Sequence, residues 1–421
     1  MPVNLEVPAS VSPVGGVSLA AVAAGLKSDG AKDLVLISLP AQSSVAAVFT
    51  RNAYCAAPVT VSREHLGQSN RDIRALLINS GGANAATGSE GVSNARQHCA
   101  RVALQLDIGP QQVLPFSTGV IGEQLPTETM LNGITAAAAV MGDSTSHWHD
   151  AAAGIMTTDT VPKQYSVQVE IEGRTVTLSG FAKGSGMIQP NMATMLAYVF
   201  TDAAIDATLL QECLVATAGR SFNSITVDGD TSTNDSVVLA ATGASAVVLD
   251  RNHSGWSAFQ GALDEIFLWL AHSLVRDGEG ASKFITIDVQ GGRSPEDCRQ
   301  VGLTVGNSPL VKTAFFASDA NLGRIIMAVG RSGIDYLDID QLSLRLGVEV
   351  AKGIDATATT LTDVLIKGQP ATGYSDEIGQ AIMQSSEIVV SIDLGMGSSQ
   401  WTCWACDISH DYVSINADYR S

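Results

Sequence analysis

The run from Lys183 to Met195 combines the residue types that a self-cleaving hydroxyl nucleophile needs. It reads Lys-Gly-Ser-Gly-Met-Ile-Gln-Pro-Asn-Met-Ala-Thr-Met, with flexible glycines, a turn-forming Pro-Asn pair and a small residue directly before a threonine. The Thr194 hydroxyl could attack the carbonyl carbon of Ala193 and form an ester that water hydrolyses. Cleavage would leave Thr194 as a new N-terminus, whose free amine can act as the base for its own hydroxyl. The alternative is a glycine-rich turn that enters a hydrophobic strand.

The histidines suggest no other base for such a hydroxyl. They are dispersed along the chain, at His65, His98, His147, His149, His253, His272 and His410. The sequence also contains no G-x-S-x-G elbow, no Walker loop and no convincing dinucleotide fingerprint. An α-amine has an ordinary pKa of about 7.7 to 8.0, which leaves an appreciable neutral fraction near pH 7. The amine of an N-terminal threonine would therefore serve as the missing base.

Two glycine-containing segments follow predicted strands and could meet a charged group. The segment 79–88 also precedes a predicted helix, so its backbone amides could bind an anion, although a capped strand-to-helix turn is slightly favoured. In the segment 116–122, Thr118 and Gly119 could present a hydroxyl or a backbone N–H to a developing oxyanion.

Two further loops carry carboxylates. The segment 225–235 contains three aspartates, one asparagine and three threonines, but its spacing does not match a calcium loop. A hydrogen-bonded turn that supports an active site is favoured over a metal site. The segment 276–283 offers Glu279 on a glycine-flanked backbone, where it could bind an ammonium group or lie in a solvated turn.

Composition narrows the class of protein. The chain has 421 residues, 45% of them hydrophobic and 16% charged, which predicts a large core in one unit or two closely packed ones. Its net charge of -18 disfavours nucleic acid. Six scattered cysteines fit a reducing compartment. The Cys403–Cys406 pair lacks the second pair of a structural zinc site, and we predict two strand cysteines of ordinary packing. Without a basic leader or an apolar run of about 18 residues, we expect a cytoplasmic protein with no membrane segment.

Periodicity predicts alternating strands and helices, which indicates an α/β or α+β class. The predicted strands are 34–39, 45–49, 73–79, 113–116, 195–200, 236–241, 284–289, 388–393 and 401–408. The predicted helices are 91–106, 127–141, 207–221, 256–275 and 321–330. Residues 166–178 read as a hairpin with a primed turn at Glu172-Gly173. If the strand after Thr194 lies in the core, the pieces 1–193 and 194–421 must stay interlocked after cleavage.

These residues, taken together, resemble the ornithine acetyltransferase (glutamate N-acetyltransferase) family of arginine biosynthesis. The resemblance extends from near residue 45 to the last residue, in the family's order. Its motifs are Lys183-Gly-Ser-Gly-Met-Ile-Gln-Pro-Asn-Met-Ala-Thr194, Ile155-Met-Thr-Thr-Asp-Thr160, residues 221–235, Asp277-Gly-Glu-Gly-Ala-Ser-Lys-Phe284, Leu310-Val-Lys-Thr-Ala314, Asn321-Leu-Gly-Arg-Ile325 and residues 411–421.

The resemblance implies a fold, a processing event and a reaction. The fold is a layered αββα-type sandwich of mixed sheets flanked by helices, cut into an α chain 1–193 and a β chain 194–421 that assemble as α2β2. Thr194 is the nucleophile, Thr118 and Gly119 form the oxyanion hole, and the substrate contacts are Thr157, Lys183, Thr194, Glu279, Asn416 and Ser421. A ping-pong reaction moves acetyl from N-acetylornithine to glutamate. Lys183 suits a carboxylate, and Glu279 suits an ammonium group or an amide N–H.

Several points stay open at this level. We expect no metal and no cofactor, but the sequence does not decide whether acetyl-CoA is a co-substrate, or whether Thr157 or Thr158 contacts the substrate. The chain departs from the family's usual residues at Gly82, Leu322 and Ser421. The first two changes put fine specificity in doubt. One alternative function is a self-cleaving amidohydrolase or β-peptidyl aminopeptidase-like hydrolase, and another is a relative that processes itself and only binds ligands.

Overall fold

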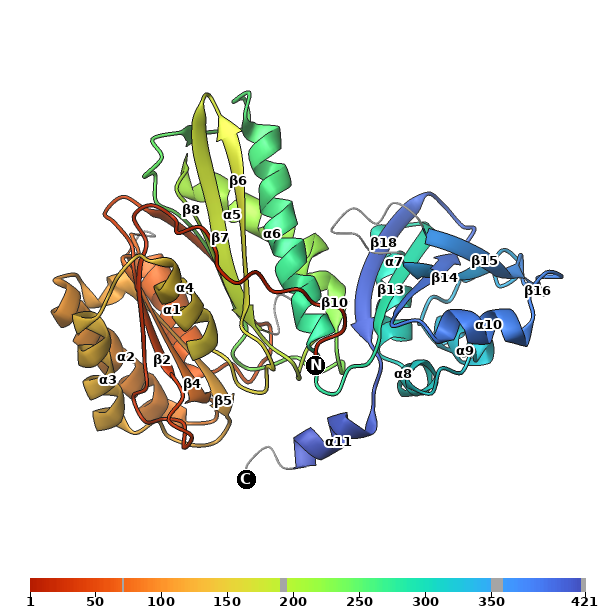
Figure 1. Ribbon diagram of the computed structural model, residues 1–421, viewed down its shortest axis with the longest axis horizontal. Helices are drawn as coiled ribbons and strands as arrows, with labels where there is room; N and C mark the ends of the chain where they lie inside the picture. The colour runs from red at the N-terminus through yellow and green to blue at the C-terminus, as the bar shows by residue number, and fades with distance from the viewer. Residues whose placement is uncertain (70–71, 190–194, 350–358, 418–421) are drawn as a thin grey trace.

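The computed structural model describes residues 1–69, 72–189, 195–349 and 359–417 (Figure 1). The strands are β1 Ser18–Val22, β2 Leu34–Ser38, β3 Ser44–Phe49, β4 Ala75–Gly82, β5 Val113–Val120, β6 Lys163–Ile171, β7 Arg174–Lys183, β8 Leu196–Thr201, β9 Ala204–Ile205, β10 Ile225–Thr226, β11 Ser236–Ala241, β12 Val248–Leu249, β13 Phe284–Gly292, β14 Ser343–Glu349, β15 Thr359–Ile366, β16 Gln369–Pro370, β17 Glu387–Asp393 and β18 Ser399–Cys406. The helices are α1 Ala57–Gln68, α2 Gly88–Leu106, α3 Thr127–Ala139, α4 Thr145–Gly154, α5 Ala207–Arg220, α6 Trp256–Arg276, α7 Pro295–Gly306, α8 Pro309–Phe316, α9 Leu322–Gly330, α10 Asp376–Met383 and α11 His410–Ala417, with 3-10 turns at Pro110–Gln112 and Phe222–Ser224.

Two mixed sheets face each other and form the middle of a four-layer sandwich (Figure 1). The first has the order β1-β2-β4-β5, and the second has the order β3-β11-β8-β7-β6. Ile37, Phe116 and other residues of the first sheet pack against Tyr198, Val238 and their neighbours in the second. The outer face of the first sheet is covered by α2 and α3, and that of the second by α5 and α6. The expected mixed α/β class with its layered αββα arrangement is therefore confirmed.

The predicted strands and helices lie where the periodicity placed them, with ends shifted by a few residues. The predicted hairpin is the β6–β7 pair, and Glu172 and Gly173 have φ values of 53° and 72°. Positive φ at both central residues is the geometry of a primed turn, whose twist matches that of the flanking strands.

A third mixed sheet forms a separate layer with its own core. Its order is β10-β18-β13-β17-β14-β15-β16, and α7, α8, α9 and α10 lie with it to one side of the sandwich (Figure 1). Cys403 belongs to this core, whereas Cys406 packs into the core around α5 and α6. Both thiols are free and buried, so the prediction of two packing cysteines is confirmed. None of the helices in the described ranges has both the length and the apolar character needed to cross a bilayer.

Candidate active site

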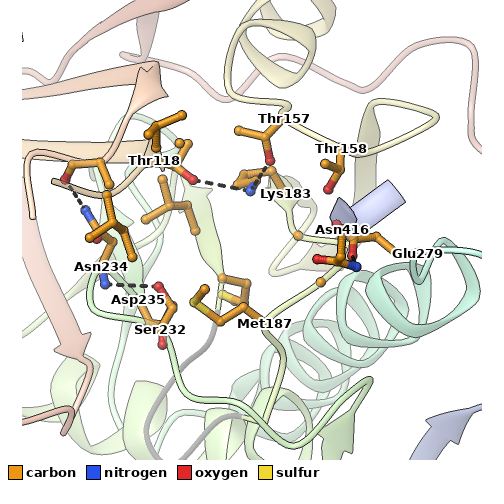
Figure 2. A pocket seen from close by; sticks show the side chains of 18 residues that line it. Thr118, Thr157, Thr158, Lys183, Met187, Ser232, Asn234, Asp235, Glu279 and Asn416 are labelled. Carbon is orange, nitrogen blue, oxygen red and sulfur yellow. Dashed lines mark hydrogen bonds between the residues drawn. The ribbon is translucent and has the colours of Figure 1, made fainter. Parts of the chain in front are cut away.

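A cavity of about 290 Å³ opens where the ends of β5, β7 and β8 meet the loops before β11 and β13 (Figure 2). Six of the residues predicted from the sequence line it together: Thr118, Gly119, Thr157, Lys183, Glu279 and Asn416. Met195 also lines it. Ala193, Thr194 and Ser421 lie outside the described residues. The described lining contains no histidine.

Backbone contact between two strands requires glycine at position 119. Gly119 pairs with Gly81 at the end of the parallel β4–β5 pair and has a φ of 131°. A Cβ on Gly119 would lie 2.3 Å from the carbonyl carbon of Gly81. No side chain fits at position 119, so only the backbone of Gly119 lines the cavity there, beside Thr118.

Lys183, at the end of β7, places an ammonium group inside the cavity. Its Nζ donates hydrogen bonds to Thr157 Oγ1 at 2.7 Å and to Thr118 Oγ1 at 3.3 Å (Figure 2). The residue is 8% exposed, and this burial lowers the pKa of the lysine, although the nearby Asp159 carboxylate opposes the shift. Thr157 is thus the threonine that contacts Lys183, while Thr158 also lines the cavity.

A buried ion cluster that the sequence reading did not identify lies behind Lys183. Lys163 Nζ is 2.5 Å from Asp159 Oδ1 and 2.6 Å from Asp277 Oδ2, and these side chains are at most 1% exposed. Asp159 also accepts hydrogen bonds from the backbone N–H groups of Thr157 and Gly184, at 3.0 and 2.7 Å. Burial alone would raise the pKa of Asp159, but the charges of Lys163 and Lys183 hold it well below its usual range. The cluster fixes the two segments from which Lys183 and Thr157 project.

Glu279 faces the cavity from the loop after α6. It is 6% exposed, and its Oε2 accepts a hydrogen bond at 2.7 Å from the side-chain amide of Asn416 on α11 (Figure 2). Its backbone N–H donates to the carbonyl of Ser185 at 2.9 Å. A Cβ on Gly186 would lie 2.4 Å from the same Oε2, so glycine leaves the room that this carboxylate occupies.

The acidic loop 225–235 supports the chain that leads toward the predicted nucleophile. Asp228 accepts hydrogen bonds from the N–H groups of Met187 and Ile188, at 2.6 and 2.9 Å. Asn234 donates from its amide to the carbonyls of Ala83 and Ser117, at 2.6 and 2.9 Å. The interpretation as a hydrogen-bonded supporting turn is confirmed. Within the described ranges, no group of three or more His, Cys, Asp or Glu side chains could hold a metal ion.

Asp235, the last residue of this loop, is the second carboxyl of the cavity. It is 2% exposed, and its Oδ2 has no hydrogen-bond partner among the described residues. Burial raises the pKa of this carboxyl well above its usual range, and the opposing effects of Ser232 and Lys183 are smaller. Nothing in the residue pattern separates Asp235 from its neighbouring aspartates, because its surroundings arise only on folding.

The two internal departures from the family pattern lie in different places. A Cβ on Gly82 would lie 2.7 Å from a methyl group of Leu125, next to the cavity-lining Ala83. Leu322 begins α9 and packs against the core of the third sheet. Among the described lining residues of the cavity there is no residue of α9. A change at 322 therefore affects packing in that layer and not the cavity wall.

Comparison with known proteins relates this chain to enzymes of arginine biosynthesis. The family model described as "ArgJ family" matches residues 18–421. The chain is similar to the arginine biosynthesis bifunctional protein argJ of Bacillus halodurans, at 38% identity over 54% of this chain and 100% of that one, with a TM-score of 0.48. It is also similar to an ornithine acetyltransferase of Mycobacterium tuberculosis solved with ornithine, at 36% identity over 44% and 96%, with a TM-score of 0.39. An L-aminopeptidase D-Ala-esterase/amidase of Ochrobactrum anthropi, titled a variant of the Ntn hydrolase fold, matches at 10% identity over 66% and 90%, with a TM-score of 0.38.

Proposed function

The chain belongs to the ArgJ family, and from this membership we propose that it is a self-cleaving acetyltransferase of arginine biosynthesis, moving acetyl from N-acetylornithine to glutamate. The observation that carries the proposal is that Lys183, Glu279, Thr118 and Gly119 line one cavity together with Met195. Met195 is the residue that follows Thr194 in the chain. Groups that suit the carboxylate and the ammonium group of an amino acid therefore lie in the same cavity as the start of the predicted β chain.

The proposed reaction uses each group in a distinct way. Thr194 attacks the acetyl carbonyl, with its own α-amine as the base, and becomes acetylated as ornithine leaves. Thr118 and Gly119 stabilise the negative charge on the carbonyl oxygen in the tetrahedral intermediate. Lys183 pairs with the substrate carboxylate, while Glu279 and Asn416 hold the far polar end. Glutamate then takes the acetyl group by the reverse steps. Ser421 and Thr157 complete the proposed substrate contacts, and no cofactor takes part.

The sheet order explains why the α and β chains would stay associated after cleavage. In the second sheet, β8 and β11 belong to residues 194–421, whereas β3, β7 and β6 belong to residues 1–193. The order β3-β11-β8-β7-β6 places two boundaries between the chains inside one sheet. Separation would break both ladders and expose the buried faces. We propose that two such αβ units form an α2β2 enzyme of the cytoplasm, for which native mass spectrometry is the test of assembly.

A denaturing mass measurement of the purified protein tests the processing step. Fragments ending at Ala193 and beginning at Thr194 are expected for the wild-type chain. The variant Thr194→Ala should remain whole and inactive. A wild-type chain that stays uncut after prolonged incubation, or normal turnover by Thr194→Ala, would contradict the assigned nucleophile.

The acceptor dependence separates acetyl transfer from hydrolysis. The enzyme should release ornithine from N-acetylornithine much faster when glutamate is present. Equal release without glutamate would indicate an amidohydrolase of the β-peptidyl aminopeptidase kind instead. Binding of both substrates by a cleaved protein without turnover would indicate a relative that only binds ligands. Replacing N-acetylornithine by acetyl-CoA in the same assay decides whether the enzyme is bifunctional.

A further inference from the structure

The cavity contains a charge pattern that the proposed roles do not fully use. Its described lining has one ammonium group, that of Lys183, and two carboxyl groups, those of Glu279 and Asp235. A diamino monocarboxylic acid such as ornithine has the opposite inventory, with one carboxylate and two ammonium groups. Lys183 and Glu279 account for one group of each sign, which leaves Asp235 facing the second amine.

Asp235 lies next to the strand that follows the predicted nucleophile. The N–H of Ser236 donates to the carbonyl of Met195 at 2.9 Å, and the parallel β8–β11 pair continues from there. On its other side, the carbonyl of Asp235 accepts a hydrogen bond at 2.9 Å from the N–H of Thr50. Figure 2 shows Asp235 on the side of the cavity away from Glu279 and Asn416. The backbone is thus held on both sides, next to the strand that begins the predicted β chain.

The side chain of Asp235 has room for a further hydrogen-bond partner. Oδ2 of Asp235 is buried without a hydrogen bond among the described residues. Such an atom costs free energy unless a ligand satisfies it. The charged group that faces Asp235 is Lys183 of β7, and Ser232 of its own loop is the nearby hydroxyl. An ammonium group in the cavity would provide the partner that Oδ2 lacks.

We propose that Asp235 is a further catalytic residue of the acetyl transfer. It gives a proton to the amine of the departing ornithine and takes a proton from the ammonium group of the incoming glutamate. The proposal rests on the proposed function. It is supported by the raised pKa of Asp235, because a raised pKa favours the protonated carboxyl, which has a proton to give.

The proton balance of the first half-reaction shows what Asp235 would do. A bond forms between Thr194 Oγ and the acetyl carbon, and the bond from that carbon to the nitrogen of N-acetylornithine breaks. The hydroxyl proton passes through the Thr194 α-amine to the departing nitrogen, which becomes a neutral amine. Asp235 then donates its proton to this nitrogen. Ornithine leaves as an ammonium ion, which cannot attack the acetyl group again, and Asp235 is left as a carboxylate.

The second half-reaction restores the starting state. The ammonium group of glutamate pairs with the Asp235 carboxylate and returns a proton to it. The neutral amine attacks the acetyl carbon, and the bond from that carbon to Thr194 Oγ breaks. The remaining excess proton on nitrogen passes through the α-amine to Thr194 Oγ. Asp235 is again a neutral acid, so no proton is gained or lost over the cycle.

The variant Asp235→Asn tests this role by comparing two acceptors on the acetylated, cleaved enzyme. Transfer to glutamate should fall by about 100-fold or more and recover as the pH rises, because free amine then forms in solution. Transfer to hydroxylamine, whose amine is uncharged near neutral pH, should be largely retained. Asp230→Asn is the matched control, since Asp230 is an exposed aspartate of the same loop. It should transfer to both acceptors at the wild-type rate.

The outcomes discriminate between this inference and the proposed function. An equal loss with both acceptors, or unchanged transfer to glutamate with the wild-type pH profile, would overturn the role of Asp235 alone. A wild-type enzyme that transfers no acetyl group would overturn the proposed function itself.

If Asp235→Asn does not yield cleaved protein, calorimetry of the wild-type enzyme gives a second test. Ornithine binding, measured in buffers with different heats of ionisation, should release about one proton as Asp235 ionises. No proton release would contradict the inference.

Discussion

Asp159 and Asp235 are two buried aspartates near Lys183, and their surroundings drive their pKa values in opposite directions. Asp159 meets Lys163 at 2.5 Å and two backbone N–H groups, and its pKa is lowered. Asp235 leaves one carboxyl oxygen without a partner among the described residues, and its pKa is raised. Burial penalises the charged form of both, so the partners alone decide the sign. The first aspartate belongs to the support of the site, and the second is available to react.

The largest expected effect comes from removing the shared cation of the ion cluster. Lys163→Met leaves the carboxylates of Asp159 and Asp277 buried without their ammonium partner. The free energy of unfolding should fall by about 3–5 kcal/mol, which denaturant titration measures. Arg220→Met is the control, because its ion pair with Asp264 is largely exposed, and its cost should stay below about 1 kcal/mol. Equal costs for the two variants would show that the cluster is not a stabilising element.

A matched pair of substitutions tests the opposite signs directly. Asp159→Asn should lower the free energy of unfolding at pH 7 by about 2–3 kcal/mol, because charged hydrogen bonds are lost. The unfolded carboxyl has a pKa of about 3.9, so the stability that Asp159 contributes is present above about pH 4 and is lost as the pH falls further. Asp159→Asn should therefore flatten the acid side of the stability curve.

Asp235→Asn should act on the other side of the same curve. A carboxyl whose pKa is raised in the folded state binds its proton more tightly there than in the unfolded chain. The stability that it contributes is therefore complete below about pH 4 and declines as the pH rises further. Removing it should reduce that decline and cost less than about 1 kcal/mol at pH 7. Denaturant titrations from pH 3 to pH 8 measure both variants. Parallel pH curves for the two variants would refute the comparison.

A change at Gly186 alters the ligand contact and leaves both aspartates in place. Gly186→Ala should leave the protein folded, because the three atoms nearest to the added methyl group all belong to the side-chain carboxylate of Glu279 and not to the backbone. Displacing that carboxylate should weaken ornithine binding by about tenfold, or about 1.4 kcal/mol. Calorimetric titration with ornithine measures the change. Unaltered affinity would mean that Glu279 does not contact the ligand.

The residue pattern predicted most of the sandwich and strands β13, β17 and β18 of the third sheet, but not the remaining strands of that sheet. Strand β11 was predicted with its observed ends, because Ser236–Ala241 is a short buried apolar run between turn signals. Strand β14, Ser343–Glu349, and helix α10, Asp376–Met383, were not predicted. Leu344, Leu346 and Val348 alternate with other residues in β14, which is a strand signal, but the run is short. Helix α10 has only eight residues, too few to show a clear helical period.

The sequence predicted some residues of the site but not the buried ion pair that supports it. Lys183 and Glu279 stand out among glycines, and the structure brings both to one cavity. Lys163 begins a strand of alternating residues and reads as a surface charge, yet its side chain is fully buried. Its partner Asp277 directly follows the C-terminal end of helix α6, in the second half of the chain. No local sequence pattern predicts an ion pair between segments that are so far apart along the chain.

The sequence by itself determined the alternation of strands and helices, the β6–β7 hairpin and the set of residues that belong near the site. These features depend on neighbours along the chain, through periodicity, turn conformation and motif order. The tertiary structure alone decided which of the many aspartates are neutralised and which is left without a partner. A carboxyl's pKa depends on burial and on charges from distant segments, and both exist only once the sheets have packed.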